Sequence, residues 1–364
     1  MEPSSSIRLI KSEAESLGKI RVAIAGVGNC CSALVQGIRY YDDNGGSEGL
    51  THESVLGYSV SDIEIVAAFD IDRRKVGRDL SEAIFSEPNE APRMVTLRPS
   101  GVAVQMGPFM DSLENSGEGL IEPAQGDAAD VAQILKEHKV DVLVNLVSGS
   151  ALEASRFYAE AALEAGCAFL NATPAPVASD KTLSGRFQKA RIPLAGDDLL
   201  DQIGATVTHI ALLEFLHERG VRIDESYQLD VGGGAESVNT LWKTRGLKRD
   251  IKTSAVSGSI PYEFPLVSGS TDYVDFLENR RDSFFWFKGS YFGGAPFTMD
   301  VKLNTVDAPN AGAILLDVIR GLKIASARGL GGPILPLCAY GFKRPPERRS
   351  IAEAHGGFKD FIKG

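Results

Sequence analysis

A short β-branched run that ends in a glycine turn constrains the fold of this chain most strongly. Residues 20–25 (IRVAIA) predict a buried strand, and Gly26-Val27-Gly28 leads into an apolar helical pattern. In dinucleotide-binding folds the first glycine permits a tight turn and the second lets a pyrophosphate approach the helix N-terminus. Cys31 stands where the third glycine of that pattern is usual. The glycine pattern alone is therefore weak evidence.

Asp70 strengthens this interpretation because it ends the next predicted strand, residues 63–69. A carboxylate at this place binds ribose hydroxyls and favours NAD over NADP. The usual distance from the glycine turn is about 20 residues. The polar stretch 42–60 is therefore predicted to be an insertion between the first helix and the second strand. One alternative is that Asp70 only caps the next helix. Another is that NADP is the cofactor, because the positive charges of Arg73 and Arg74 lie nearby in the sequence.

Strand and helix patterns continue to alternate as far as residue 195. They predict an edge segment and then helices and strands in turn, at residues 102–104, 128–138, 140–147, 151–165, 168–171, 181–190 and 192–195. Such alternation is typical of an α/β fold with a doubly wound, Rossmann-like parallel sheet.

The pattern changes after Asp198. A long helix, an alternating strand, an aromatic strand and a second alternating strand are predicted at residues 204–219, 227–231, 284–287 and 297–306. A helix over 311–328 then returns to the first domain. We therefore expect a flexible tail, a Rossmann-like domain in two segments, and an inserted α+β domain for catalysis and oligomerisation, at residues 1–18, 19–200 plus 310–364, and 201–309.

The net charge of −10 disfavours nucleic acid or an anionic membrane as the main partner. The first residues lack an apolar signal core, and no apolar run reaches the about 18 residues of a membrane span. The cysteines fit neither a disulfide framework nor zinc spacing, and no metal site is predicted; they are Cys30, Cys31, Cys167 and Cys338. These features predict a soluble, cytoplasmic protein.

Ordered motifs extend from about residue 20 to 347, among them VAIAGVGNCCSALVQGI, AAFDID, FLNATP, GDD followed by GAT, DVGGG, DAPNAG, RGLGGPILP and YGFKRPPE. With these segments the chain resembles the myo-inositol-1-phosphate synthase family, particularly its shorter bacterial and archaeal members. The resemblance implies a redox-neutral reaction of a sugar phosphate. NAD oxidises C5 of glucose 6-phosphate, an enolate forms at C6, an aldol step joins C6 to C1, and NADH reduces the ketone. It also implies a homotetramer built through the sheet of the second domain.

Such chemistry needs cations and proton carriers, which low-pKa lysines can supply. Six residues match positions that are catalytic in the family, and the resemblance implies the same role for them here: Lys248, Lys252, Lys343, Asp198, Asp307 and Arg281. It assigns the cofactor to Gly26, Gly28, Asn29, Cys30, Cys31, Asp70, Asp198 and Gly233. Lys248 and Lys343 are expected to move protons and stabilise the oxyanion, with Lys252 nearer the phosphate. The alternatives are that residues 243–252 form a solvated helix face and that the aspartates only shape turns.

The chain departs from the family pattern at the expected substrate end. Arg281 replaces a lysine, and its pKa above 12 removes it from proton transfer. Asp201 replaces a small donor near the phosphate, where a carboxylate repels phosphate unless a cation intervenes. Gly234 and Glu236 also differ.

These departures leave several functions open. The first is an inositol phosphate synthase, and the second is a variant cyclase that closes a five-membered ring from fructose 6-phosphate. An ordinary NAD-dependent dehydrogenase and a non-catalytic NAD-binding protein are less favoured. The retention of the matching lysines and aspartates argues against the last of these.

Overall fold

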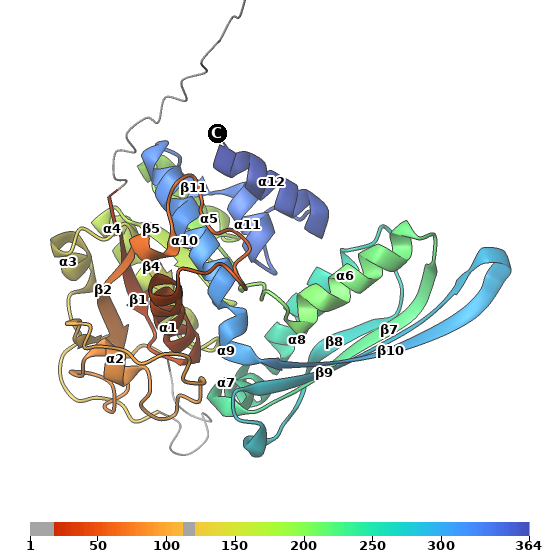
Figure 1. Cartoon of the computed structure of the whole chain (residues 1–364), viewed down its shortest axis with the longest axis horizontal. Helices are drawn as coiled ribbons and strands as arrows, with labels where there is room; N and C mark the ends of the chain where they lie inside the picture. Colours follow the sequence, from red (N-terminus) through yellow and green to blue (C-terminus); the bar gives the residue numbers. More distant parts are fainter. Residues whose placement is uncertain (1–17, 112–120, 364) are drawn as a thin grey trace, which may run out of the picture.

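The computed structural model describes residues 18–111 and 121–363. All but the last residue of the predicted tail, 1–18, lies outside the described residues. The described chain forms a layered α/β body from which a second sheet projects as an arm (Figure 1).

The body contains a seven-stranded sheet in the order β11-β6-β5-β4-β1-β2-β3. All neighbouring strands in it are parallel. Its strands are β1 (Ile20–Ala25), β2 (Ile63–Asp70), β3 (Val104–Met106), β4 (Val142–Asn145), β5 (Ala168–Asn171), β6 (Pro193–Ala195) and β11 (Gly332–Pro333). From β3 to β6 this is the strand order of dinucleotide-binding folds. The predicted doubly wound, Rossmann-like α/β fold is confirmed.

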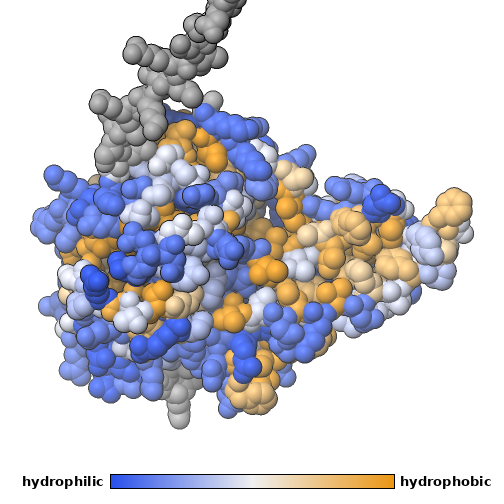
Figure 2. All heavy atoms as spheres, viewed as in Figure 1, coloured by the Kyte–Doolittle hydropathy of each residue, from blue (hydrophilic) through white to orange (hydrophobic). Residues whose placement is uncertain are grey.

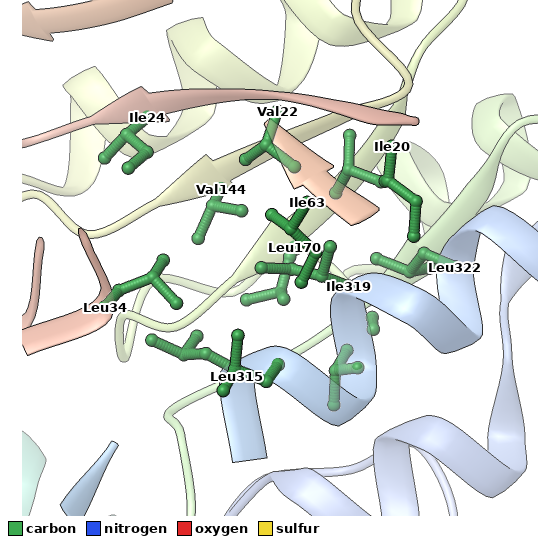
Figure 3. Packing of buried hydrophobic residues seen from close by; sticks show 14 of the residues in the cluster. Ile20, Val22, Ile24, Leu34, Ile63, Val144, Leu170, Leu315, Ile319 and Leu322 are labelled. Carbon is green, nitrogen blue, oxygen red and sulfur yellow. The ribbon is translucent and has the colours of Figure 1, made fainter. Parts of the chain in front are cut away.

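Helices cover both faces of this sheet. One face packs against α1 (Asn29–Asn44), α10 (Gly312–Ala327), α11 (Leu335–Gly341) and α12 (Ile351–Lys363). The other packs against α3 (Val131–Glu137), α4 (Leu152–Ala165) and α5 (Lys181–Ala190). Figure 3 shows how the β-branched residues of β1 meet the leucines and isoleucines of α10. Because both faces are covered, the strands are apolar throughout rather than alternating.

The arm is a mixed sheet in the order β10-β9-β7-β8, in which only β7 and β8 run parallel. Its strands are β7 (Arg222–Gly232), β8 (Leu266–Tyr273), β9 (Arg280–Tyr291) and β10 (Ala295–Val306). Helices α6 (Ala205–Glu218) and α8 (Arg245–Ser257) pack on one face, where Phe285 and Phe287 are buried. The opposite face is not covered by either helix.

Of the short elements, α9 (Asp307–Asn310) joins β10 of the arm to α10 of the body. The others lie within the body or within the arm, namely α2 (Leu80–Ala83), α7 (Gly234–Asn239) and short helical turns at Val60–Asp62, Thr240–Thr244, Asp275–Leu277 and Phe292–Gly294. In the DVGGG motif, Gly232 ends β7 and Gly234 already begins α7. The helix predicted from 128 begins at Val131, since the Asp130 side chain accepts a hydrogen bond from the Gln133 N–H and caps it there. The stretch 45–62 does connect α1 with β2, as predicted.

Candidate active site

A cleft of about 320 Å³ opens at the carboxyl ends of the parallel strands and continues beneath the second sheet. Ligands bind at this edge in doubly wound sheets. The cleft brings together most of the residues predicted for the site, namely Gly26, Gly28, Asn29, Cys30, Asp70, Asp198, Gly233, Lys248, Arg281, Asp307 and Lys343. Cys31 and Lys252 are not among its lining residues.

The two glycines of the first turn serve different purposes. Gly26 has a φ of +95°, and a Cβ there would lie 2.6 Å from the carbonyl oxygen of Leu146. Only glycine therefore allows β1 to turn so close to the end of β4. At Gly28 a Cβ would meet nothing within 4 Å, so its Cα faces open space in the cleft. That open space at the N-terminus of α1 suits a pyrophosphate.

Asp70 ends β2 and braces the glycine turn. One carboxylate oxygen accepts a hydrogen bond from the Val27 N–H at 2.7 Å. The other accepts from the N–H groups of Ile71 and Asp72 at 2.8 and 2.9 Å. Asp70 therefore caps a turn rather than a helix, while it also lines the cleft where a ribose ligand is expected.

The segment after α2 also belongs to the cofactor end, although the sequence patterns did not point to it. Asn29 Oδ1 accepts hydrogen bonds from the N–H groups of Glu90 and Ala91. The amide of Asn89 donates to the Val27 carbonyl and accepts from Lys75 Nζ at 3.0 Å. Both Asn89 and Lys75 line the cleft. These contacts join segments about 60 residues apart, which local periodicity does not report.

Cys31, which the resemblance assigns to the cofactor, has different surroundings from its neighbour Cys30. Its side chain is fully buried in the core beneath α1, whereas Cys30 lines the cleft. Burial raises the pKa of the Cys31 thiol. Cys31 is thus a packing residue in the first turn of α1, where a small apolar side chain takes the place of the missing glycine.

The end of the cleft that is predicted to bind the substrate begins where β6 stops. Residues after β6 pair with the segment after α11, because Lys343 N–H donates to the Asp198 carbonyl at 2.7 Å. This pairing places Lys343 Nζ 3.3 Å from Asp198 Oδ1 and 3.8 Å from Asp201 Oδ2. A cation therefore does lie beside the carboxylate of Asp201, which lines the cleft.

These groups keep each other charged. Burial by itself would raise the pKa of Asp198, but the ammonium groups of Lys343 and Lys248 outweigh it and hold that pKa below its usual value. Burial would lower the pKa of Lys343, yet Asp198 and Asp201 raise it above its usual value. Lys343 is therefore not the low-pKa lysine that we expected, because two carboxylates stabilise its ammonium form.

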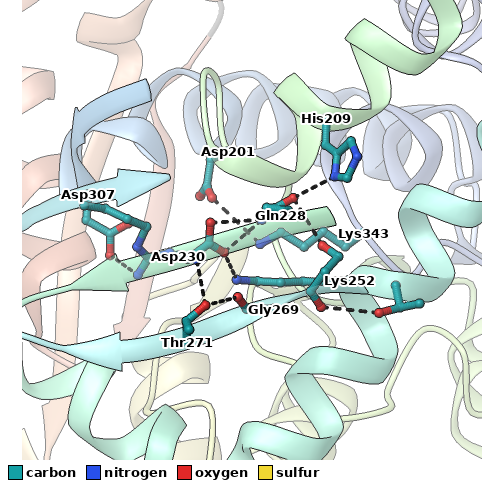
Figure 4. A network of polar contacts seen from close by, with 12 residues as sticks. Asp201, His209, Gln228, Asp230, Lys252, Gly269, Thr271, Asp307 and Lys343 are labelled. Atoms are coloured by element: carbon teal, nitrogen blue, oxygen red, sulfur yellow. Dashed lines mark hydrogen bonds and ion pairs between the residues drawn. The ribbon is translucent and has the colours of Figure 1, made fainter. Parts of the chain in front are cut away.

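Lys248 and Lys252 lie one turn apart on α8, as their spacing predicts, but their surroundings differ. Lys248 lines the cleft. Lys252 is buried, and its Nζ donates to Asp230 Oδ2 at 2.6 Å (Figure 4). Burial, with Arg281 nearby, lowers the pKa of Lys252 despite the opposing effect of Asp230. The basic stretch is therefore divided, because Lys252 is buried whereas Arg245 and Arg249 are exposed.

Arg281 and Asp307 form an ion pair at the cleft, with Arg281 Nη2 2.9 Å from Asp307 Oδ2. Asp307 begins α9, and its N–H donates to the Asn279 carbonyl, which fixes the backbone there. Gly233 and Gly234 line the same end of the cleft. The side chain of Glu236, which was predicted to differ from the family, lies outside the described part, as does that of Ala235.

One buried atom in the cleft lacks a protein partner. Asp198 Oδ2 accepts no hydrogen bond from the described residues, although the carboxylate is buried. Buried polar atoms in folded proteins are nearly always satisfied, so such an atom in a cleft indicates a place for a ligand donor.

Comparison with known proteins identifies the chain's relatives. Residues 204–308 match the family model described as myo-inositol-1-phosphate synthase. The chain is 41% identical over 357 residues to the inositol-3-phosphate synthase of Mycobacterium tuberculosis, which covers 96% of this chain and 97% of that protein. The chain belongs to the myo-inositol-1-phosphate synthase family.

A further relative and a solved structure agree with this assignment in extent and fold. The inositol-3-phosphate synthase of Corynebacterium glutamicum is 42% identical over 360 residues, 95% of this chain and 99% of that protein. The crystal structure of Ari2 superposes with a TM-score of 0.76 at 32% identity, over 95% of this chain and all of that one. The resemblance predicted from the motifs is thereby confirmed along nearly the whole chain.

Two further observations concern membrane-spanning helices and metal sites. None of the described helices is both long and apolar enough to cross a bilayer. Within residues 18–111 and 121–363, no group of three or more His, Cys, Asp or Glu side chains is arranged to hold a metal ion.

Proposed function

We propose that the chain uses NAD to convert a hexose 6-phosphate into a cyclitol phosphate without net oxidation, most simply glucose 6-phosphate into 1L-myo-inositol 1-phosphate. One observation carries the proposal. A dinucleotide-type glycine turn and a cluster of lysines, an arginine and aspartates line the same cleft. The names of the relatives, inositol-3-phosphate synthases, support the choice of reaction.

The cofactor end fits NAD. Space is open above Gly28 at the N-terminus of α1, and Asp70 lies at the end of β2 as a ribose acceptor. The unpartnered Oδ2 of Asp198 offers an acceptor farther along the cleft. When bound, NAD supplies a hydride acceptor that is restored before the product leaves.

The proposed reaction balances as an isomerisation. The C5 alcohol loses a hydride and a proton, and C6 then loses a proton to form an enolate. A bond forms between C6 and C1, the C1 oxygen gains a proton, and a hydride and a proton return to C5. The protein must therefore stabilise one developing oxyanion and move protons at C5–O, C6 and C1–O.

The chain's cations suit these tasks differently. Lys343, kept as an ammonium by Asp198 and Asp201, would stabilise negative charge on the C5 oxygen. Lys248 faces the cleft and would move the proton between C5–O and C6. Arg281 stays charged and, held by Asp307, would bind the phosphate without exchanging protons.

A second candidate is a variant cyclase that makes a five-membered cyclitol phosphate from fructose 6-phosphate. The observation that favours it is the carboxylate of Asp201 in the cleft, 3.8 Å from Lys343. A carboxylate accepts hydrogen bonds from sugar hydroxyls but repels a phosphate, so it would change which part of the sugar lies beside Lys343.

We also propose a cytoplasmic homotetramer without a nucleic-acid or membrane partner. Tyr227 and Trp286 stack with ring centroids 5.5 Å apart on neighbouring strands of the arm. Their face is opposite to the one that α6 and α8 cover, and Phe284 and Val267 are exposed beside them. Figure 2 shows apolar residues spread along the projecting arm. Burial of this face between subunits would remove it from water.

The deciding experiment incubates the chain and NAD separately with glucose 6-phosphate and fructose 6-phosphate and identifies products by NMR. We expect a cyclitol phosphate without net NADH formation. Stoichiometric NADH with an oxidised sugar would instead identify an ordinary dehydrogenase. Lys343→Ala should abolish turnover, whereas Lys189→Ala on α5, outside the cleft, should leave it unchanged. Full activity of Lys343→Ala would refute its assigned role.

A further inference from the structure

A row of polar side chains lies beneath the cleft, on the inner face of the second sheet. Ser226, Gln228 and Asp230 occupy alternate positions of β7, so they share the face covered by α6 and α8. All three are buried. Burying polar groups on a sheet face that otherwise packs phenylalanines costs free energy of folding unless these groups are hydrogen-bonded.

The row has a fixed direction of hydrogen bonding. Gln228 Oε1 accepts from Ser268 Oγ at 3.1 Å and lies 3.2 Å from His209 Nδ1. The amide nitrogen of Gln228 is therefore left to donate to Asp230, at 2.8 and 3.1 Å from its two oxygens. Burial lowers the pKa of His209 to about 4, so this imidazole adds no positive charge to the row.

The row ends at a lysine. Asp230 Oδ2 accepts from Lys252 Nζ at 2.6 Å, and both side chains are almost fully buried. Figure 4 shows Lys252 and Lys343 extending alongside each other with their ammonium groups directed toward Asp230 and Asp201. Lys252 is thus buried beside the cleft-lining Lys343, and its ammonium group is hydrogen-bonded to Asp230.

We propose that Asp230, oriented by Gln228, is a positioning residue that keeps Lys252 as an ammonium at a fixed place beneath the reacting sugar. The inference rests on the proposed function, since it assigns Lys252 a permanent charge rather than a proton-carrying task. A fixed cation there would complement the negative charge that develops during enolisation.

The charges around Lys252 make this counter-ion necessary. Arg281 on β9 and Lys343 after α11 both repel the Lys252 ammonium, while Asp230 on β7 attracts it. Asp198, after β6, interacts more strongly with Lys343 and Lys248 than with Lys252. From α6 the neutral His209 contacts Gln228 and Ser226 of the row, and β8 contributes the uncharged Ser268. Without Asp230, burial and two neighbouring cations would lower the pKa of Lys252 further.

The test compares Asp230→Asn, which keeps the shape, with Asp224→Asn at an exposed position of the same strand. In Asp230→Asn the pKa of Lys252 in the folded state is expected to be lower than in the wild type. The pH range over which the folded state binds fewer protons than the unfolded state is therefore wider in the variant. Its deficit in Tm relative to the wild type should therefore shrink as the pH rises from about 7 to about 9.5. Asp224→Asn should show no such trend, and a pH-independent deficit in Asp230→Asn would overturn the proposal.

Turnover gives the second measurement. Because the ammonium form of Lys252 is required, the alkaline limb of kcat should move to lower pH by about one unit or more in Asp230→Asn, with KM little changed. Lys252→Met should be inactive at every pH. A rise in kcat near neutral pH would overturn the proposal, since it would mean that the amine is required. A wild type inactive on both hexose 6-phosphates would refute the proposed function, and the Tm comparison would still decide whether Asp230 keeps Lys252 charged.

Discussion

At the scale of single residues, the site depends on charges that stabilise one another inside the fold. Lys343, Asp198 and Asp201 meet within 4 Å although 145 residues separate Lys343 from Asp198. Removal of one partner leaves the other as an uncompensated buried charge, which costs more than the pair contributes. The pair therefore makes both activity and stability sensitive to either residue.

Lys343→Met should lower the free energy of unfolding by about 3–5 kcal/mol near neutral pH, because it removes the cation that interacts most strongly with the buried carboxylate of Asp198. The pKa of Asp198 is lowered, so its contribution is present above the unfolded pKa and is lost as the pH falls through the folded value. The pKa of Lys343 is raised, so its contribution is present below the unfolded pKa and is lost as the pH rises through the folded value. Urea unfolding across pH measures this.

The control for Lys343→Met is the double variant Lys343→Met/Asp198→Asn. It should recover part of the lost stability, because the buried carboxylate of Asp198 is then neutralised together with its lysine. Strictly additive losses would contradict the coupling.

Asp201→Ser should strengthen inhibition by inorganic phosphate by about tenfold or more, since a like-charge pair at about 4 Å costs about 4 kcal/mol before screening. It should also shift the preference between glucose 6-phosphate and fructose 6-phosphate, as measured by kcat/KM for each. Asp201→Asn is the matched variant, because it removes the charge and keeps the size. An unchanged inhibition constant in both variants would show that the phosphate lies elsewhere.

At the scale of elements, the two glycines of the turn between β1 and α1 have different surroundings. Gly26 is required by its positive φ and by the nearness of Leu146, whereas Gly28 faces only open space. The same two-glycine pattern thus contains one position that the backbone requires and one that borders only open space.

Gly28→Val should weaken NAD binding by about tenfold or more while leaving Tm nearly unchanged, because its side chain fills only the space of the cleft. Fluorescence titration with NADH and a thermal melt measure the two effects. Gly37→Ala within α1 is the control and should keep the affinity while it stabilises the helix by about 0.5–1 kcal/mol. Equal affinity in Gly28→Val would place the pyrophosphate away from this turn.

At the scale of the whole molecule, the arm has one covered and one open face. The inner face holds the row ending at Asp230 and the buried phenylalanines, while the outer face carries the stacked Tyr227 and Trp286. Strand β10 alternates between half-buried and exposed residues along its whole length. An assembly through the outer face would leave the cleft of each subunit on the other side of its sheet.

Tyr227→Glu should reduce the mass measured by light scattering from that of four chains toward that of a smaller species, because a charge cannot be buried unpaired in an apolar contact. Glu225 is exposed on the same face nearer the end of the strand, and Glu225→Gln is expected to leave the mass unchanged. A mass of one chain in the wild type would refute the tetramer.

Much of the fold was predictable because it depends on local order. Apolar runs such as residues 20–25 and 168–171 and the helical pattern of 152–165 report their own burial. The motif resemblance located the lysines and aspartates that meet in the cleft. Neither source indicated Gln228, Asn89 or His209, because their importance lies in partners that are distant in sequence.

The sequence by itself determined the strand, glycine turn and helix at the start of the chain, the doubly wound order and the identity of the candidate cations. Only the tertiary structure decided that Cys31 packs in the core, that Lys343 has a raised pKa and that Lys252 donates a hydrogen bond to Asp230. The physical reason is that secondary structure follows from neighbours along the chain, whereas a side chain's charge state follows from neighbours in space.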